Sequence, residues 1–84
     1  MVSMGYAEAL EAAVATQIKI ELIERGMDQK ALADAVGIER ATLSRYMTGK
    51  RSMPMPTFCK VAEVLGLTPV ALMQKADDRI QREG

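Results

Sequence analysis

The stretch that decides the fold is Gln29–Thr48, QKALADAVGIERATLSRYMT. In its first half, Leu32 and Val36 lie about one helical turn apart, which predicts a short helix with an apolar face. Ala33 lies beside them, and its small side chain allows a second helix to approach closely. Gly37 then predicts a sharp turn at positive φ, a conformation that glycine adopts at little cost. The first half is therefore typical of a short helix that ends in a tight turn.

The second half of the stretch predicts another short helix, over residues 40–48, whose two faces differ in chemistry. Leu43 and Tyr46 point to one side, with Met47 at their edge. At about 100° per residue, the opposite side carries Arg40, Ala41, Ser44 and Arg45. One face is thus apolar and available for packing, while the other presents two guanidinium groups, a hydroxyl and a methyl group.

Glycine and proline divide the rest of the chain into further helical segments. Besides residues 29–36 and 40–48, helices are expected at 7–25, at 55–65, and from Pro69 onward after a Thr68 cap. Asp28 is expected to cap the second helix. Since no segment alternates between apolar and polar residues, the fold class is predicted to be all-α with five helices.

The two outer helices carry more specific expectations. In the first, the apolar stripe is formed by Leu10, Val14, Ile18 and Leu22, and Ile23 widens it. After Ala76 the last helix becomes mostly polar, so residues 77–84 are expected to fray or to form a linker. The whole chain, residues 1–84, is expected to form a single domain.

Composition excludes several classes of protein. The chain has 84 residues, no His and one Cys, so a zinc site and Ser–His or Cys–His catalysis are not expected. No metal and no cofactor is implied. No apolar run reaches the roughly 18–20 residues of a membrane span, and no secretory signal is visible. These features favour a cytoplasmic protein that is not an enzyme.

The charge is balanced overall but unevenly distributed. Eleven basic residues match eleven acidic ones. Residues 26–60, however, hold six basic against three acidic residues, a net charge of +3, whereas the segments on either side are net negative. A local basic patch on a neutral protein favours a docked polyanion.

The spacing in Gln29–Thr48 resembles the helix-turn-helix of the phage repressor and Cro-type family, often called the XRE family. The resemblance covers about residues 16–73 and rests on Ala33, Gly37, Leu32, Val36, Ile38, Leu43 and Tyr46. It implies a compact five-helix bundle with the helix-turn-helix at the second and third helices. It also implies sequence-specific binding of double-stranded DNA by a transcriptional regulator of a phage, prophage, plasmid or bacterium, with repression by operator occupancy preferred.

Within this motif we expect the DNA-binding residues to be Gln29, Arg40, Ala41, Thr42, Ser44, Arg45, Lys50 and Arg51. An exposed Arg can donate two hydrogen bonds to guanine, and a methyl group can pack on thymine. Gln29 begins a helix whose N–H groups favour a phosphate, and Lys50 and Arg51 follow the recognition helix toward the DNA backbone. Glu39 is expected to cap the recognition helix, with contact to cytosine N4 as the alternative.

Two questions of partnership follow. A single recognition helix reads few base pairs, and the family commonly forms two-fold dimers with half-sites roughly 34 Å apart. The candidate dimer surfaces are the last helix and the front of the first: Val70, Leu72, Met73 and Ile80, and Tyr6, Leu10, Ala13 and Val14. The alternative function is a protein-interaction module on the same scaffold, such as an antitoxin that binds a partner protein.

Overall fold

The computed structural model describes residues 5–83. They form five helices and no strand: α1 (Tyr6–Arg25), α2 (Gln29–Val36), α3 (Arg40–Met47), α4 (Met55–Val64) and α5 (Pro69–Glu83). The all-α, five-helix prediction is confirmed, and each of the first four helices ends within one residue of its expected end.

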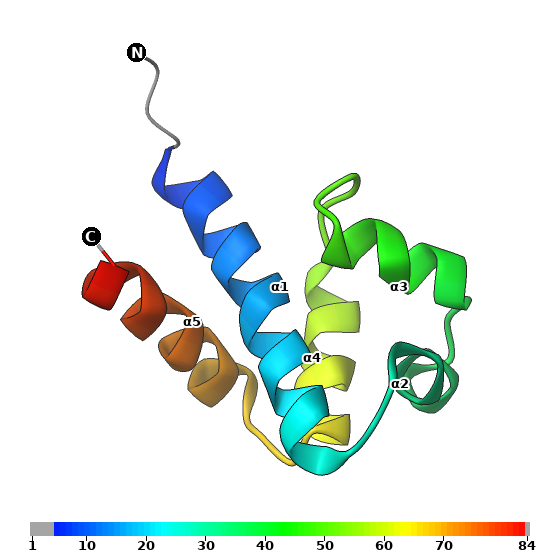
Figure 1. Ribbon diagram of the computed structural model, residues 1–84. Helices are drawn as coiled ribbons and strands as arrows, with labels where there is room; N and C mark the ends of the chain where they lie inside the picture. Colours follow the sequence, from blue (N-terminus) through cyan, green and yellow to red (C-terminus); the bar gives the residue numbers. More distant parts are fainter. Residues whose placement is uncertain (1–4, 84) are drawn as a thin grey trace.

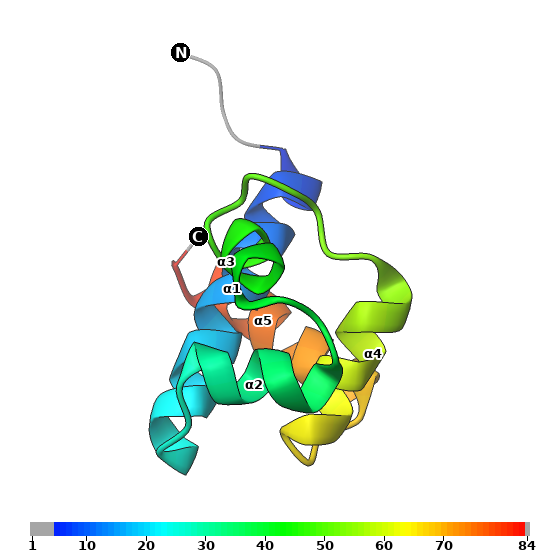
Figure 2. The ribbon, with the colours of Figure 1, turned by 90° about the vertical axis from the view of Figure 1, so that its right-hand side faces the viewer.

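Helix α1 lies between α5 on one side and the α2–α4 group on the other (Figure 1). Helices α2 and α3 run across each other. Figure 1 shows α2 along its axis and α3 from the side, whereas Figure 2 shows α2 from the side and α3 along its axis. Helix α3 lies at the edge of the molecule opposite α5. The arrangement therefore leaves one flank of α3 open.

Short side chains and glycines set the helix ends. The Asp28 carboxylate accepts the Ala31 N–H at 2.8 Å and begins α2, and the Thr68 hydroxyl accepts the Ala71 N–H at 3.0 Å and begins α5. Both predicted caps are confirmed. Gly26 ends α1 at a φ of 62°, in the left-handed region that favours glycine. These devices keep the connections between helices short.

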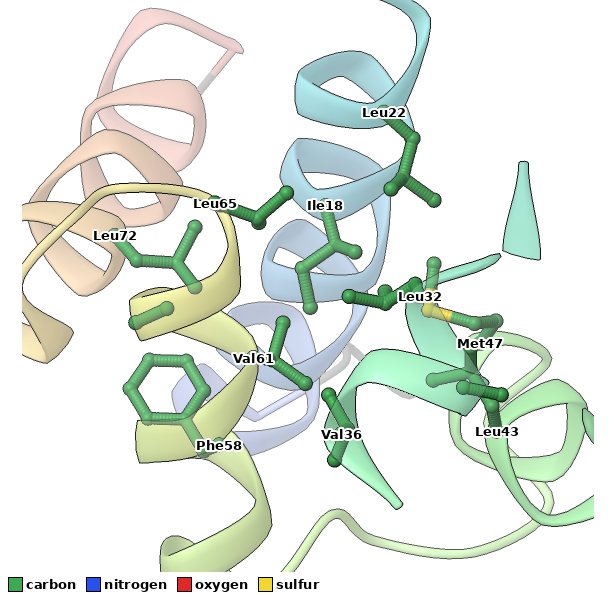
Figure 3. Packing of buried hydrophobic residues seen from close by; sticks show 12 residues of the cluster. Ile18, Leu22, Leu32, Val36, Leu43, Met47, Phe58, Val61, Leu65 and Leu72 are labelled. Atoms are coloured by element: carbon green, nitrogen blue, oxygen red, sulfur yellow. The ribbon is translucent and has the colours of Figure 1, made fainter. Parts of the chain in front are cut away.

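The core is one cluster to which all five helices contribute (Figure 3). Ile18 and Leu22 of α1 lie against side chains of the other helices, and Leu32, Leu43 and Leu72 are fully buried. The remaining buried members are Ala33, Val36, Met47, Phe58, Val61, Ala62 and Leu65. Because α2 and α3 each pack only one face into this cluster, their other faces remain in solvent.

The buried stripe of α1 differs in part from the predicted one. Ile23, expected to widen the stripe, is 78% exposed, whereas Ala13 and the polar Gln17 and Glu21 are buried. Ile18 and Leu22 of the predicted stripe are buried and Val14 packs against the core, so this part of the prediction is confirmed. The stripe widens toward Ala13, Gln17 and Glu21 and not toward Ile23, because α5 covers that flank of α1 and offers partners to the polar residues there.

For residues 77–84, expected to fray or to form a linker, the described part shows no fraying: helix α5 continues to Glu83, and Gly84 lies outside the described residues. The Tyr6 hydroxyl donates to Asp77 Oδ1 at 2.6 Å, a bond that raises the pKa of Tyr6, and Arg79 Nε donates to Gln17 Oε1 at 2.7 Å. Side-chain hydrogen bonds therefore connect the polar end of α5 to α1.

Candidate nucleic-acid interface

The turn between α2 and α3 is closed by the backbone. Gly37 has a φ of 89°, and the N–H groups of Gly37 and Ile38 both donate to the Ala33 carbonyl, at 2.8 and 3.0 Å. Ala33 itself is fully buried, which allows the two helices to approach each other. The predicted positive φ at Gly37 is confirmed, and it fixes the direction in which α3 leaves the turn.

Helix α3 divides into a packed face and an open face. Leu43 and Met47 are buried, and Tyr46 is half-buried at the edge of the core. Met47 was expected at the edge and Tyr46 inside, so these two residues exchange places. On the open face Arg40, Ala41, Ser44 and Arg45 are exposed, and Thr42 is half-buried. The structure thus brings these predicted site residues together on one helix.

The turn after α3 folds back onto the end of the helix. The N–H groups of Lys50 and Arg51 both donate to the Arg45 carbonyl, at 2.9 and 3.2 Å. Gly49 permits this path with a φ of 79°. Three basic residues are therefore held next to one another. The sequence placed Lys50 and Arg51 after the helix but did not show that the chain returns to Arg45.

Gln29 occupies a different place, at the start of α2, and is half-buried. The Asp28 carboxylate accepts a hydrogen bond from the Ala31 N–H, so one of the backbone donors that were expected to face a phosphate is already paired. The backbone N–H groups of Gln29 and Lys30 have no acceptor among residues 5–83. The α2 terminus therefore retains two free donors next to a carboxylate.

The basic side chains of the site have no partner within residues 5–83. Among the described residues, no hydrogen bond or ion pair involves the side chains of Arg40, Arg45, Lys50 or Arg51. Lys30, in contrast, pairs with Asp34, four residues further along α2, at 3.0 Å. The α3 surface and its following turn thus present free cations in solvent, where a polyanion is the natural counter-charge.

Glu39 does not behave as predicted. It is the N-cap residue of α3, with φ −70° and ψ 146°, but its side chain makes no capping hydrogen bond. Side chains with a single methylene, such as Asp, reach the first N–H groups of a helix readily. The Glu39 carboxylate is exposed instead, so the expected capping role is wrong.

A buried polar junction between α1 and α5 was not anticipated. Glu21 is 2% exposed, accepts from Gln17 Nε2 at 2.7 Å and from Arg25 at 2.5 Å, and lies 3.5 Å from Lys75 Nζ. Arg25 also donates to the Leu65 carbonyl at 2.5 Å. The spacing of Gln17, Glu21 and Arg25, four residues apart, is the signal that would have indicated a shared helix face.

Burial alone would raise the pKa of the Glu21 carboxyl, but its partners outweigh burial. Hydrogen bonds from Arg25 and Gln17, together with the charges of Lys75 and Arg25, hold the pKa of Glu21 below its ordinary value near 4.5. The carboxylate is therefore ionised at neutral pH and acts as the centre of a structural contact.

Sites of other kinds are sparse. In the part of the chain that the structure describes, no group of three or more Cys, Asp or Glu side chains is placed to hold a metal ion. No single described helix has the length and composition to cross a membrane; α4 and α5 pass that test only together, and they are bent by 94° relative to each other.

The geometry defines a class of protein: two short crossed helices joined by a tight turn, the second exposed and cationic, form a helix-turn-helix of the kind that docks on DNA. A family model described as helix-turn-helix matches residues 18–72, and the chain belongs to this family, the XRE-type helix-turn-helix proteins that its sequence resembles. This family is one of DNA-binding transcriptional regulators and not of enzymes.

Solved structures share the fold. The clp gene regulator ClgR from Corynebacterium glutamicum matches with a TM-score of 0.81 at 18% sequence identity, over 88% of this chain and 79% of that chain. A mutant of the restriction-modification controller protein C.Esp1396I matches with a TM-score of 0.81 at 21% identity, over 89% of this chain and 97% of that chain. No curated protein matches the chain significantly.

Proposed function

We propose that this protein is a transcriptional repressor that occupies an operator of a bacterial or phage genome and thereby hinders RNA polymerase. Helix α3 enters the major groove. The observation that supports this proposal is the open face of α3, where exposed cationic and polar side chains have no partner among the described residues. Such a protein acts in the cytoplasm of the bacterium or of the phage's host.

The site residues divide into base readers and backbone anchors. Arg40 and Arg45 are the proposed readers, because an Arg on a recognition helix can donate to guanine O6 and N7 together. Ala41, Thr42 and Ser44 lie between them and complete the surface that faces the bases. Gln29, Lys50 and Arg51 lie outside α3 and are the proposed phosphate anchors.

The first experiment asks whether the full chain selects a DNA sequence. The protein is incubated with a pool of random duplexes at two salt concentrations, and the bound fraction is sequenced. We expect one short motif whose affinity falls as salt rises, because phosphate contacts release counterions. Absence of both a motif and a salt dependence would favour the alternative, a protein-interaction module.

The second experiment separates readers from anchors on the selected site. Arg40→Ala and Arg45→Ala should each lose about 1–3 kcal/mol of discrimination at one or two base-pair positions. Lys50→Ala should weaken binding to all sequences alike and lower the salt slope by about one. If both Arg variants lose affinity uniformly across all sites, α3 is not the reader.

We further propose that the repressor is a homodimer. Two predicted interface residues are excluded, since Leu72 and Ala13 are buried within the monomer. An apolar groove of about 130 Å³ remains. Four helices and the loop between α3 and α4 contribute its apolar lining: Leu10, Val14 and Ala15 of α1, Tyr46 of α3, Met53 of the loop, Met55 and Phe58 of α4, and Met73 of α5. Tyr6 and Val70 are exposed in the adjoining hollow.

The exposed apolar residues in and beside this groove support a second copy as its occupant, because a two-fold interface brings the same apolar patch of both subunits together. Sedimentation at micromolar concentration should show a dimer, and Met55→Glu, which places a charge on an exposed residue of the groove, should shift it toward monomer. A monomer both free and on DNA, with an asymmetric footprint, would contradict this proposal.

A further inference from the structure

The carboxylate of Glu39 lies on the proposed DNA-binding surface, where the phosphates of a docked DNA would repel it. Glu39 immediately precedes α3, is exposed, and has no hydrogen bond or ion pair through its side chain among the described residues. It is also the one acidic residue in the stretch 39–52, which holds Arg40, Arg45, Lys50 and Arg51. Neither helix capping nor an internal salt bridge accounts for it.

Position makes this carboxylate part of the recognition surface. In helix-turn-helix proteins the N-terminal residues of the second helix contact the base edges. A side chain at the N-cap of α3 therefore meets either phosphates or bases when the helix docks. Phosphates repel a carboxylate, and an ionised carboxylate can only accept hydrogen bonds, so a stable complex needs a donor on a base.

The donors in the major groove narrow the choice of base. Only the amino groups of cytosine and adenine donate there. The adenine amino group has the N7 acceptor beside it and the O4 acceptor of thymine on its other side, and both repel a carboxylate. The cytosine amino group has an acceptor, guanine O6, on one side only. A carboxylate therefore discriminates in favour of cytosine.

We propose that Glu39 is a specificity-determining residue that accepts a hydrogen bond from cytosine N4 at one position of each half-site. The inference rests on the proposed function, since it requires α3 to lie in the major groove. Glu39 acts in two ways at once: it favours a C·G pair at its own position, and it lowers affinity for every sequence that lacks this pair, because its charge then faces phosphates or acceptors without compensation.

The test compares the wild-type chain with Glu39→Gln on the selected site and on duplexes that carry each of the other three base pairs at each position in turn. An amide keeps the shape of the side chain but removes its charge, and it pairs well with adenine N6 and N7. In wild type, replacement of the cytosine should cost about tenfold in affinity, most of all for thymine, whose O4 is an acceptor. In Glu39→Gln this preference should vanish or pass to adenine.

The same variant should bind unrelated DNA about two- to threefold more tightly at low salt, since one repulsive charge is gone. Asp78→Asn is the matched control, because it removes an exposed carboxylate from α5, which lies across α1 from α3 (Figure 1). It should leave the base preferences unchanged. Thermal melting of both variants should match wild type.

Failure of the inference about Glu39 and failure of the proposed function give different results. If wild type selects a motif but Glu39→Gln keeps the same preference at every position, the inference about Glu39 is overturned while the proposed function stands. If Glu39→Gln and Asp78→Asn raise affinity equally on all sequences, the carboxylate acts as bulk charge and the inference is overturned as well. If wild type selects no motif, the proposed function itself fails.

Discussion

Arg25 at the end of α1 and Arg45 near the end of α3 carry the same guanidinium group into different surroundings. Arg25 donates to the Glu21 carboxylate and to the Leu65 carbonyl, each at 2.5 Å, and its side chain is 32% exposed. Arg45 is exposed, and its side chain has no partner among the described residues. The first Arg holds α1 to the end of α4, and the second remains available to a ligand.

The two acidic residues differ in the same way. Glu21 is enclosed by donors in the junction between α1 and α5, whereas Glu39 extends into solvent beside the cations of α3. The comparison teaches that charge in this small domain is structural on one flank and free on the other. Three predictions test that division and one tests the turn that positions α3; they are given from the largest expected effect to the smallest.

The largest effect is expected from Glu21→Ala. The change leaves Arg25 and Lys75 without their shared carboxylate, and we expect a loss of about 2 kcal/mol in the free energy of unfolding. This is less than for a fully buried pair, because the two cations are 32% and 48% exposed. Urea denaturation measures it. Glu24→Ala, on an exposed residue of the same helix, is the control and should change stability little.

Gly37→Val tests the turn between α2 and α3, which sets the direction of α3. A Cβ at Gly37 would meet no atom within 4 Å, so the cost comes from the φ of 89° and not from crowding. We expect a β-branched residue to lose about 1–3 kcal/mol. The melting temperature should fall by at least about 4 °C. Asn adopts positive φ more readily, so Gly37→Asn should cost less; equal stability of all three proteins would contradict the turn.

Arg25→Ala and Arg45→Ala test the comparison directly. Arg25→Ala should lower the free energy of unfolding by about 1–2 kcal/mol, because the Glu21 carboxylate and the Leu65 carbonyl each lose one donor. The folded variant should still bind its DNA site. Arg45→Ala should change stability by less than about 0.5 kcal/mol but weaken specific DNA binding. Thermal melts and binding curves on one DNA site measure both. If both variants lose stability equally, the division is wrong.

The smallest effect is a dependence of stability on acid. The folded-state pKa of Glu21 lies below its unfolded value, so its stabilisation is complete above about pH 4.5 and is lost as pH falls through the folded pKa. The melting temperature of wild type should therefore fall more steeply below about pH 4.5 than that of Glu21→Gln. Melts in a series of buffers at constant ionic strength measure the difference, and parallel curves would contradict it.

Local sequence predicted the elements well. Gly37, Asp28 and Thr68 act at their own positions: a positive φ and two helix caps depend on the backbone within a few residues. For the same reason the open face of α3 followed from helical periodicity, once Leu43 identified the packed side. Such features need no knowledge of distant parts of the chain.

Contacts between distant segments decided what sequence reasoning missed. Tyr6 meets Asp77 and Gln17 meets Arg79 across 71 and 62 residues, and these bonds keep α5 helical where its polarity suggested fraying. The exposure of Ile23 and the burial of Glu21 likewise depend on which flank of α1 is covered by α5. The sequence around an apolar or charged residue does not show which distant residue it will contact in the folded chain.

For this protein, the sequence by itself determined the five helices, their caps, the helix-turn-helix and the chemistry of the α3 face, because short-range hydrogen bonds and side-chain periodicity are encoded within single helical turns. Tertiary structure alone decided that Ile23 is exposed and that the polar end of α5 is bonded to α1 through Tyr6 and Arg79. It also decided that a carboxylate can be buried in α1, since the free energy of a buried charge depends on partners that only the folded chain brings together.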